Sequence, residues 1–194
     1  MGLAALFSSL AILASSPSSL LLAQADAPPA AQAPVSTGTS HDAQANADAV
    51  ANGEDPFPTG APTDDYGFVG WCYGALAGHL ALYDKVLPQV KRIEGEFPDA
   101  STTLDKVMDS YRVQHERGEQ ILSRYDRALS VEEASGKTGG VDRAAAVARG
   151  HDAWQGSDTA EPRQLAQLWM SWALPDRCQS TAARLAPSGG GDLR

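Results

Sequence analysis

The chain has 194 residues and a formal net charge of −9 at pH 7, with 43% hydrophobic and only 7% aromatic residues. Its cations form no cluster, which argues against nucleic-acid binding and against attraction to an anionic membrane surface. Arginine outnumbers lysine and alanine is abundant, a composition typical of GC-rich bacterial genomes.

Residues 1–25 have the pattern of a signal peptide. An apolar run over 3–14 is interrupted by a Ser/Pro segment, resumes, and contains no charged side chain. Ala23-Gln24-Ala25 fits the small-x-small rule for cleavage, so we expect a mature chain that begins at Asp26. No Lys or Arg precedes the run, and this leaves an uncleaved anchor as the alternative. After cleavage we expect no membrane span and a periplasmic or secreted protein.

The rest of the chain divides by composition into three parts. Residues 26–63 are rich in Ala, Pro and Asp, contain neither Lys nor Arg, and predict a disordered leader. Residues 64–186 carry the apolar patterning of one helical domain, and the Gly-rich residues 187–194 predict a flexible tail.

Cys72 and Cys178 are the two cysteines of the chain. Because an even number of cysteines in an exported protein usually pairs, we predict one disulfide, with two free thiols as the alternative. Closure of a loop of about 100 residues stabilises a fold by roughly 4–5 kcal/mol in the chain-entropy interpretation.

The patterned segments after residue 63 all have helical spacing, and none alternates as a strand does. They predict helices over residues 64–96 (with a kink at Pro88), 101–129, 141–155 and from 162 to the break at Pro175, followed by a last turn or two over 176–186. Short connections favour antiparallel neighbours, so the predicted fold is an all-α, antiparallel bundle of about four helices. In the two helices before Pro175 we expect the inner side to contain Ala144, Val147, His151, Trp154, Leu165, Leu168, Trp169 and Trp172.

One side of the first predicted helix is made of small residues, among them Gly70, Gly74 and Gly78. A glycine in a helix interior costs about 1 kcal/mol, and a row of them indicates close approach of another backbone. The partner could be a helix of the same chain, a second copy of the protein, or an envelope protein. Because residues 66–83 carry no formal charge, a membrane location is a further alternative.

Three histidines, His79, His115 and His151, are expected on the inner or semi-inner sides of three different helices. At a rise of 1.5 Å per residue, His79 and His115 fall within about 6 Å of each other along the axis. They could contribute to a transition-metal site for zinc or copper, or each could be a core residue hydrogen-bonded to Tyr83 or Tyr111. The tyrosines could also line a ligand groove, although an aromatic stripe with helical spacing usually forms core.

No catalytic motif is found. Gly136-Lys137-Thr138 lacks the first glycine of a phosphate-binding loop, and His115-Glu116 lacks the second histidine of a zinc-protease helix. We therefore expect a non-catalytic exported helical protein that acts as a binding or accessory component of the bacterial envelope and needs no cofactor. The alternative is a metal- or small-ligand-binding bundle that uses its inward-facing histidines.

Overall fold

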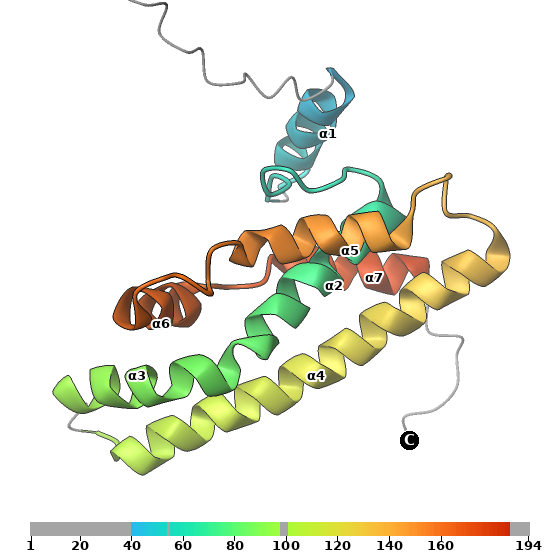
Figure 1. Cartoon of the computed structure of the whole chain (residues 1–194). Coiled ribbons are helices and arrows are strands. Elements are labelled where there is room, and N and C mark those ends of the chain that lie inside the picture. Colours follow the sequence, from blue (N-terminus) through green and yellow to red (C-terminus); the bar gives the residue numbers. More distant parts are fainter. Residues whose placement is uncertain (1–39, 54, 98–100, 187–194) are drawn as a thin grey trace, which may run out of the picture. The chain divides into compact units, whose positions relative to one another are not determined.

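The computed structural model describes residues 40–53, 55–97 and 101–186, which form seven α-helices and one 3-10 turn and contain no strand (Figure 1). The elements are α1 (Ser40–Ala51), α2 (Asp65–Ala81), α3 (Tyr83–Glu96), α4 (Leu104–Ser135), α5 (Arg143–His151), η1 (Asp152–Trp154), α6 (Pro162–Ser171) and α7 (Asp176–Leu185). The all-α class is confirmed. The predicted signal peptide and C-terminal tail lie outside the described residues.

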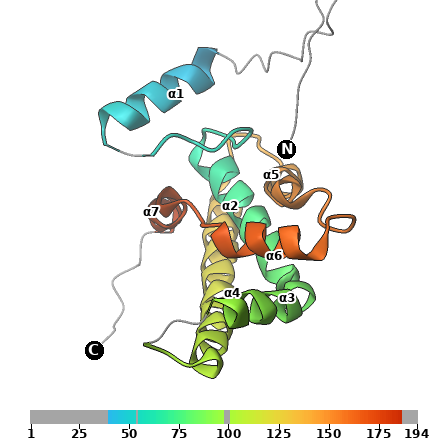
Figure 2. The same cartoon turned by 90° about the vertical axis from the view of Figure 1, so that its left-hand side faces the viewer.

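Helix α2 is central to the domain. It contacts α4, α5 and α7, and Figure 2 shows α5 and α7 on opposite sides of it. Helix α3 contacts α4 and α6. Because α2 is covered from several directions, the absence of formal charge over residues 66–83 is explained by burial within the domain. In the described ranges no helix combines the length and the apolarity that crossing a membrane requires. A simple antiparallel bundle of about four helices is not confirmed.

The first predicted helix is interrupted at Leu82, not at Pro88. Leu82 N–H donates to His79 O at 3.3 Å, a tightened last turn, and α3 begins at the next residue. Pro88 lies inside α3 and has no N–H, so the carbonyl of Asp84 loses its helical donor. The helix continues through the proline, and the break falls at Leu82, which is buried in the cluster that also contains Trp154, Leu165 and Trp169.

Helix α4 begins and ends at identifiable caps. The Thr103 hydroxyl accepts from Lys106 N–H, and Gly136 ends the helix in the left-handed conformation at φ 70°. The helix extends beyond the predicted end at residue 129 because no breaker precedes Gly136. Its last turns are held to α2, where the Tyr66 hydroxyl donates to Glu133 at 2.7 Å.

The inner side predicted for the C-terminal helices is confirmed in part, because Trp154, Leu165 and Trp169 are buried. In α5 the buried residues are Ala146 and Gly150, whereas Ala144 and His151 are exposed. In α6 the side chain of Leu168 is also outside the core, with 53% of its surface exposed. Apolar residues occur on more than one side of these short helices, so periodicity alone identified the packed face only in part.

Part of the predicted leader has structure. Residues 40–51 form α1, and Phe57 packs edge-on against Phe68 of α2 with ring centroids 4.9 Å apart. The Arg177 guanidinium lies 4.1 Å from the centre of the Phe57 ring and donates to the carbonyl of Asp55. The packed domain therefore begins about ten residues before the predicted boundary at residue 64.

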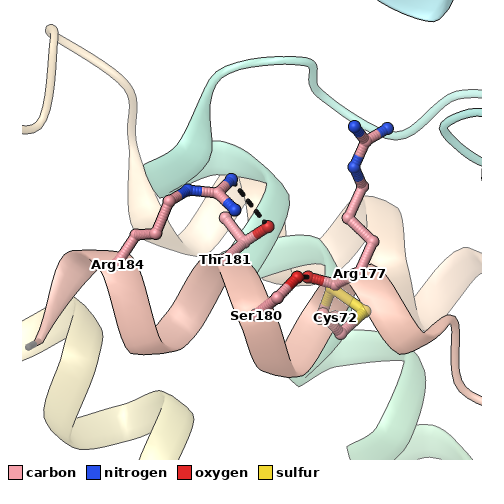
Figure 3. The surroundings of a disulfide bond; sticks show 6 residues. Cys72, Arg177, Ser180, Thr181 and Arg184 are labelled. Carbon is pink, nitrogen blue, oxygen red and sulfur yellow. Dashed lines mark hydrogen bonds between the residues drawn. A yellow bond between two sulfur atoms is a disulfide. The ribbon is translucent and has the colours of Figure 1, made fainter. Parts of the chain in front are cut away.

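Cys72 of α2 and Cys178 of α7 form the predicted disulfide, with Cα atoms 5.9 Å apart and a sequence separation of 106. Both residues are fully buried. Figure 3 shows Arg184 next to Thr181, to which it donates at 3.1 Å, and Arg177 extending away from the same helix. Arg184 also pairs with Asp65 at the start of α2. Helix α7 is thus joined to α2 by one covalent bond and by polar contacts beside it.

Candidate functional site

The predicted glycine face of α2 is occupied by the same chain. A Cβ added at Gly70 would lie 2.8 Å from the Cβ of Ala146 in α5, and a Cβ at Gly74 would overlap the carbonyl oxygen of Val147. At Gly78 the neighbour is the indole ring of Trp154. Of the partners we considered, the helix of the same chain is the one that the structure places on this face. These glycines are therefore not a free docking surface.

The close approach is reciprocal. A Cβ at Gly150 of α5 would overlap the carbonyl oxygen of Trp71 in α2. Gly150 was not among the predicted contact residues, although Ala146 and Gly150 have the small-xxx-small spacing that indicates such a contact. Both backbones approach because neither helix has a side chain at the crossing.

His79 is packed among indole rings near the end of α2. Its imidazole stacks on Trp169 with centroids 4.5 Å apart and on Trp172 at 4.6 Å. The Trp169 indole N–H donates to the backbone carbonyl of His79 at 2.8 Å, and Trp154 donates in the same way to Ala75. The two indole donors fix α6 and η1 against α2, so the position of the imidazole is determined by three elements.

Burial lowers the pKa of His79 to about 4, and the nearby His115 lowers it further in the same direction. The ring is therefore neutral at neutral pH. Its Nδ1 atom is buried and has no hydrogen-bond partner among the described residues. A buried polar atom without a partner costs about 1–3 kcal/mol of folding free energy, so this nitrogen destabilises an otherwise well-packed region.

His79 and His115 line the same cavity, which has a volume of about 220 Å³. The predicted similar height of the two residues agrees with this arrangement. His115 packs against Tyr83 with centroids 4.3 Å apart. Tyr111, also in the wall, donates its hydroxyl to Glu94 at 2.5 Å, and burial together with this bond raises the pKa of the phenol.

The cavity changes in character from its floor to its mouth. The buried side chains of the lining, Leu76 and Trp169, are each 5% exposed. The exposed lining residues are polar, namely Gln114, Arg117 and Gln179. A molecule in this space would therefore contact aromatic and aliphatic groups inside and hydrogen-bonding groups at the opening.

The third predicted histidine is elsewhere. His151 ends α5, is exposed, and is not part of the cavity wall. Across the described ranges, no three His, Cys, Asp or Glu side chains come together in a group that could hold a metal ion. His79 and His115 therefore line one cavity, and no described His, Cys, Asp or Glu side chain joins them as a third metal ligand.

Several wall residues were not identified as a site from the sequence. Trp169 and Trp172 were expected in the core, and Arg117 was not considered. Arg117 lies one residue before the buried Gly118, the point where α4 meets Leu80 of α2, and that glycine was the available signal. Of the tyrosines considered for a groove, Tyr111 lines this cavity.

The structure thus defines an all-α, disulfide-linked domain with an aromatic-walled cavity between α2, α4 and α6. No protein-family model, curated protein or solved structure matches the chain.

Proposed function

We propose that this protein is a non-catalytic, exported accessory component of the bacterial envelope, and that it binds a small molecule in the cavity lined by His79 and His115. The observation that carries the proposal is the cavity of about 220 Å³ itself, which two imidazoles and two indoles line and at whose opening polar side chains lie. A bound ring would bury apolar surface of this wall, and the polar groups at the opening would fix its orientation.

The wall chemistry supports binding without a reaction. The two cysteines are joined to each other, so neither is available as a nucleophile. His79 is held neutral between indole rings and has no hydroxyl or carboxylate hydrogen-bonded to it among the described residues. Ligand sites in proteins are commonly apolar cavities with a few placed polar groups, which is the pattern found here.

The exported address is supported by the signal-like residues 1–25 and by the disulfide, which is typical of proteins in oxidising compartments. An envelope partner protein would use a surface other than the glycine face of α2, because α5 and η1 cover that face. A metal version of the site has only the two imidazoles of His79 and His115 in its favour.

The proposal is tested by screening the full chain with monocyclic compounds of positive, zero and negative charge, and with Zn²⁺ and Cu²⁺, by NMR of the indole N–H signals. A ligand in the cavity should shift the signals of Trp169 and Trp172 and leave that of Trp71, which does not line the cavity, unchanged. A thermal shift that rises with ligand concentration should accompany the change.

The matched variant is His79→Phe, which keeps a flat ring between the indoles and removes both ring nitrogens. It should fold and lose binding, whereas His151→Gln should bind as the parent does. The proposal is wrong if no compound moves the cavity signals, or if His79→Phe binds with unchanged affinity.

A further inference from the structure

From the size and polarity of the cavity we infer that its ligand is a small aromatic carboxylate, with the ring on the indole floor and the carboxylate on Arg117 at the mouth. This inference rests on the proposed function, because it names the class of molecule that the same cavity would take.

The volume limits the ligand to a single ring. An engineered protein cavity of about 150 Å³ accommodates benzene, and drug-sized ligands occupy about 300–1,000 Å³. The cavity here measures about 220 Å³, which suits one six-membered ring with a small substituent.

The floor favours a flat apolar group. Trp169 and Trp172 supply aromatic surface, and Leu76, Leu80 and Ile121 supply aliphatic surface. Aromatic rings attract one another in offset or edge-on arrangements by about 0.5–1.5 kcal/mol beyond the area that they bury. A planar ring therefore gains more here than a flexible chain of the same volume.

The mouth favours an anion. Arg117 lines the cavity and makes no ion pair with any described residue, although the chain carries a net charge of −9. The neighbouring carboxylate of Glu116 is bound by Arg112 instead. A free guanidinium beside an apolar cavity presents two parallel donors in the geometry that a carboxylate accepts.

The same lining disfavours a cation. An aromatic cage for an ammonium group would be completed by a carboxylate, and no Asp or Glu is among the residues that line this cavity. Gln114 and Gln179 at the mouth add amide groups that can donate to an anion beside Arg117. The carboxylate is thus the polar group that fits.

The test compares benzoate, benzyl alcohol and benzylammonium at pH 7.5 with the full chain, by titration of tryptophan fluorescence and of the indole NMR signals. Because Arg117 is exposed, its ion pair with a carboxylate should contribute at most about 1 kcal/mol, so benzoate should bind about two- to fivefold more tightly than benzyl alcohol. Arg117→Gln should remove this preference and leave the affinity for benzyl alcohol unchanged.

The control is Arg127→Gln, which removes an exposed arginine from the same helix, outside the cavity. It should bind benzoate as the parent does; equal losses in the two variants would assign the effect to net charge and overturn the inference. If benzyl alcohol or benzylammonium binds at least as tightly as benzoate, the carboxylate assignment is wrong and the proposed function stands. If none of the three binds, the carboxylate assignment is also wrong, and the wider screen above decides the proposed function.

Discussion

At the scale of single residues, His79 combines two properties that usually exclude each other. It is stacked among aromatic rings as a core residue would be, and one of its nitrogens has no partner in the part of the chain that the structure describes. A phenylalanine would fill the same space without that cost. The imidazole is therefore the residue in α2 whose chemistry is least explained by packing.

The neutral state of His79 predicts a pH dependence of stability. Its pKa is about 4 in the folded chain and about 6.5 when unfolded, so the unfolded chain takes up the proton first as the pH falls. Above about pH 6.5 His79 is neutral in both states and does not lower the stability. As the pH falls from about 6.5 to 4, the unfolded chain binds the proton and the free energy of unfolding decreases. We expect the parent to lose roughly 1–3 kcal/mol more than His79→Phe between pH 7 and pH 4.

Urea unfolding of both proteins at the two pH values measures this difference. Carboxylates that titrate in the same range affect parent and variant alike and cancel. His151→Gln removes an exposed histidine and should keep the parental slope. Identical pH profiles for the parent and His79→Phe would contradict the assignment.

Gly74 gives a second prediction at this scale. Glycine to alanine in a helix interior normally stabilises by about 1 kcal/mol. At Gly74 the added Cβ would overlap the Val147 carbonyl, so Gly74→Ala should destabilise the fold by roughly 2–4 kcal/mol. Gly95→Ala is the control, because its Cβ would meet only Leu104 at 3.8 Å, and it should stabilise slightly.

Chemical denaturation of the two variants tests this sign reversal. Destabilisation of both by similar amounts would point to helix properties alone. Stability of Gly74→Ala equal to that of the parent would mean that α5 does not approach α2 as the structure shows.

At the scale of elements, α7 depends on its covalent bond. It is a helix of ten residues at the end of the described domain, and helices of that length are marginal by themselves. The flanking pair of Arg184 and Asp65 is partly exposed and contributes little, on the order of 0–1 kcal/mol.

We therefore expect the double variant Cys72→Ala/Cys178→Ala to lose about 4–5 kcal/mol of stability, as the chain-entropy interpretation gives for a loop of this length. Arg184→Ala should cost no more than about 1 kcal/mol. Guanidinium unfolding of the two variants measures both losses. Unfolding of the parent with and without reductant measures the contribution of the disulfide. A parent whose midpoint is unaffected by reductant would show that the disulfide does not stabilise the fold.

The ends of the helices show which structural features could be read from neighbouring residues in the sequence. Asp64 and Thr103 cap helices through their own side chains, and Gly136 ends α4 in a conformation that glycine adopts most readily. Such signals are readable because they involve residues three or four apart. The break at Leu82 was not predicted, because no glycine or proline marks it and the residues that bury Leu82 are distant in the sequence.

At the scale of the whole molecule, the export hypothesis makes a mass prediction. The protein recovered from the periplasm of a bacterial host should begin at Asp26 and should accept no alkylating group before reduction. Intact-mass spectrometry with and without reductant measures both properties. A chain found in the cytosol with residues 1–25 attached and two reactive thiols would contradict the export address.

The sequence by itself determined the all-α class, the pairing of its two cysteines and the common location of His79 and His115, because these follow from helical period, parity and rise per residue. Tertiary structure alone decided that α5 covers the glycines, that His151 and Leu168 are exposed, and that Arg117 stands at a cavity. The physical reason is that periodicity defines the faces of each helix, whereas the face that becomes buried depends on helices brought together from distant parts of the chain.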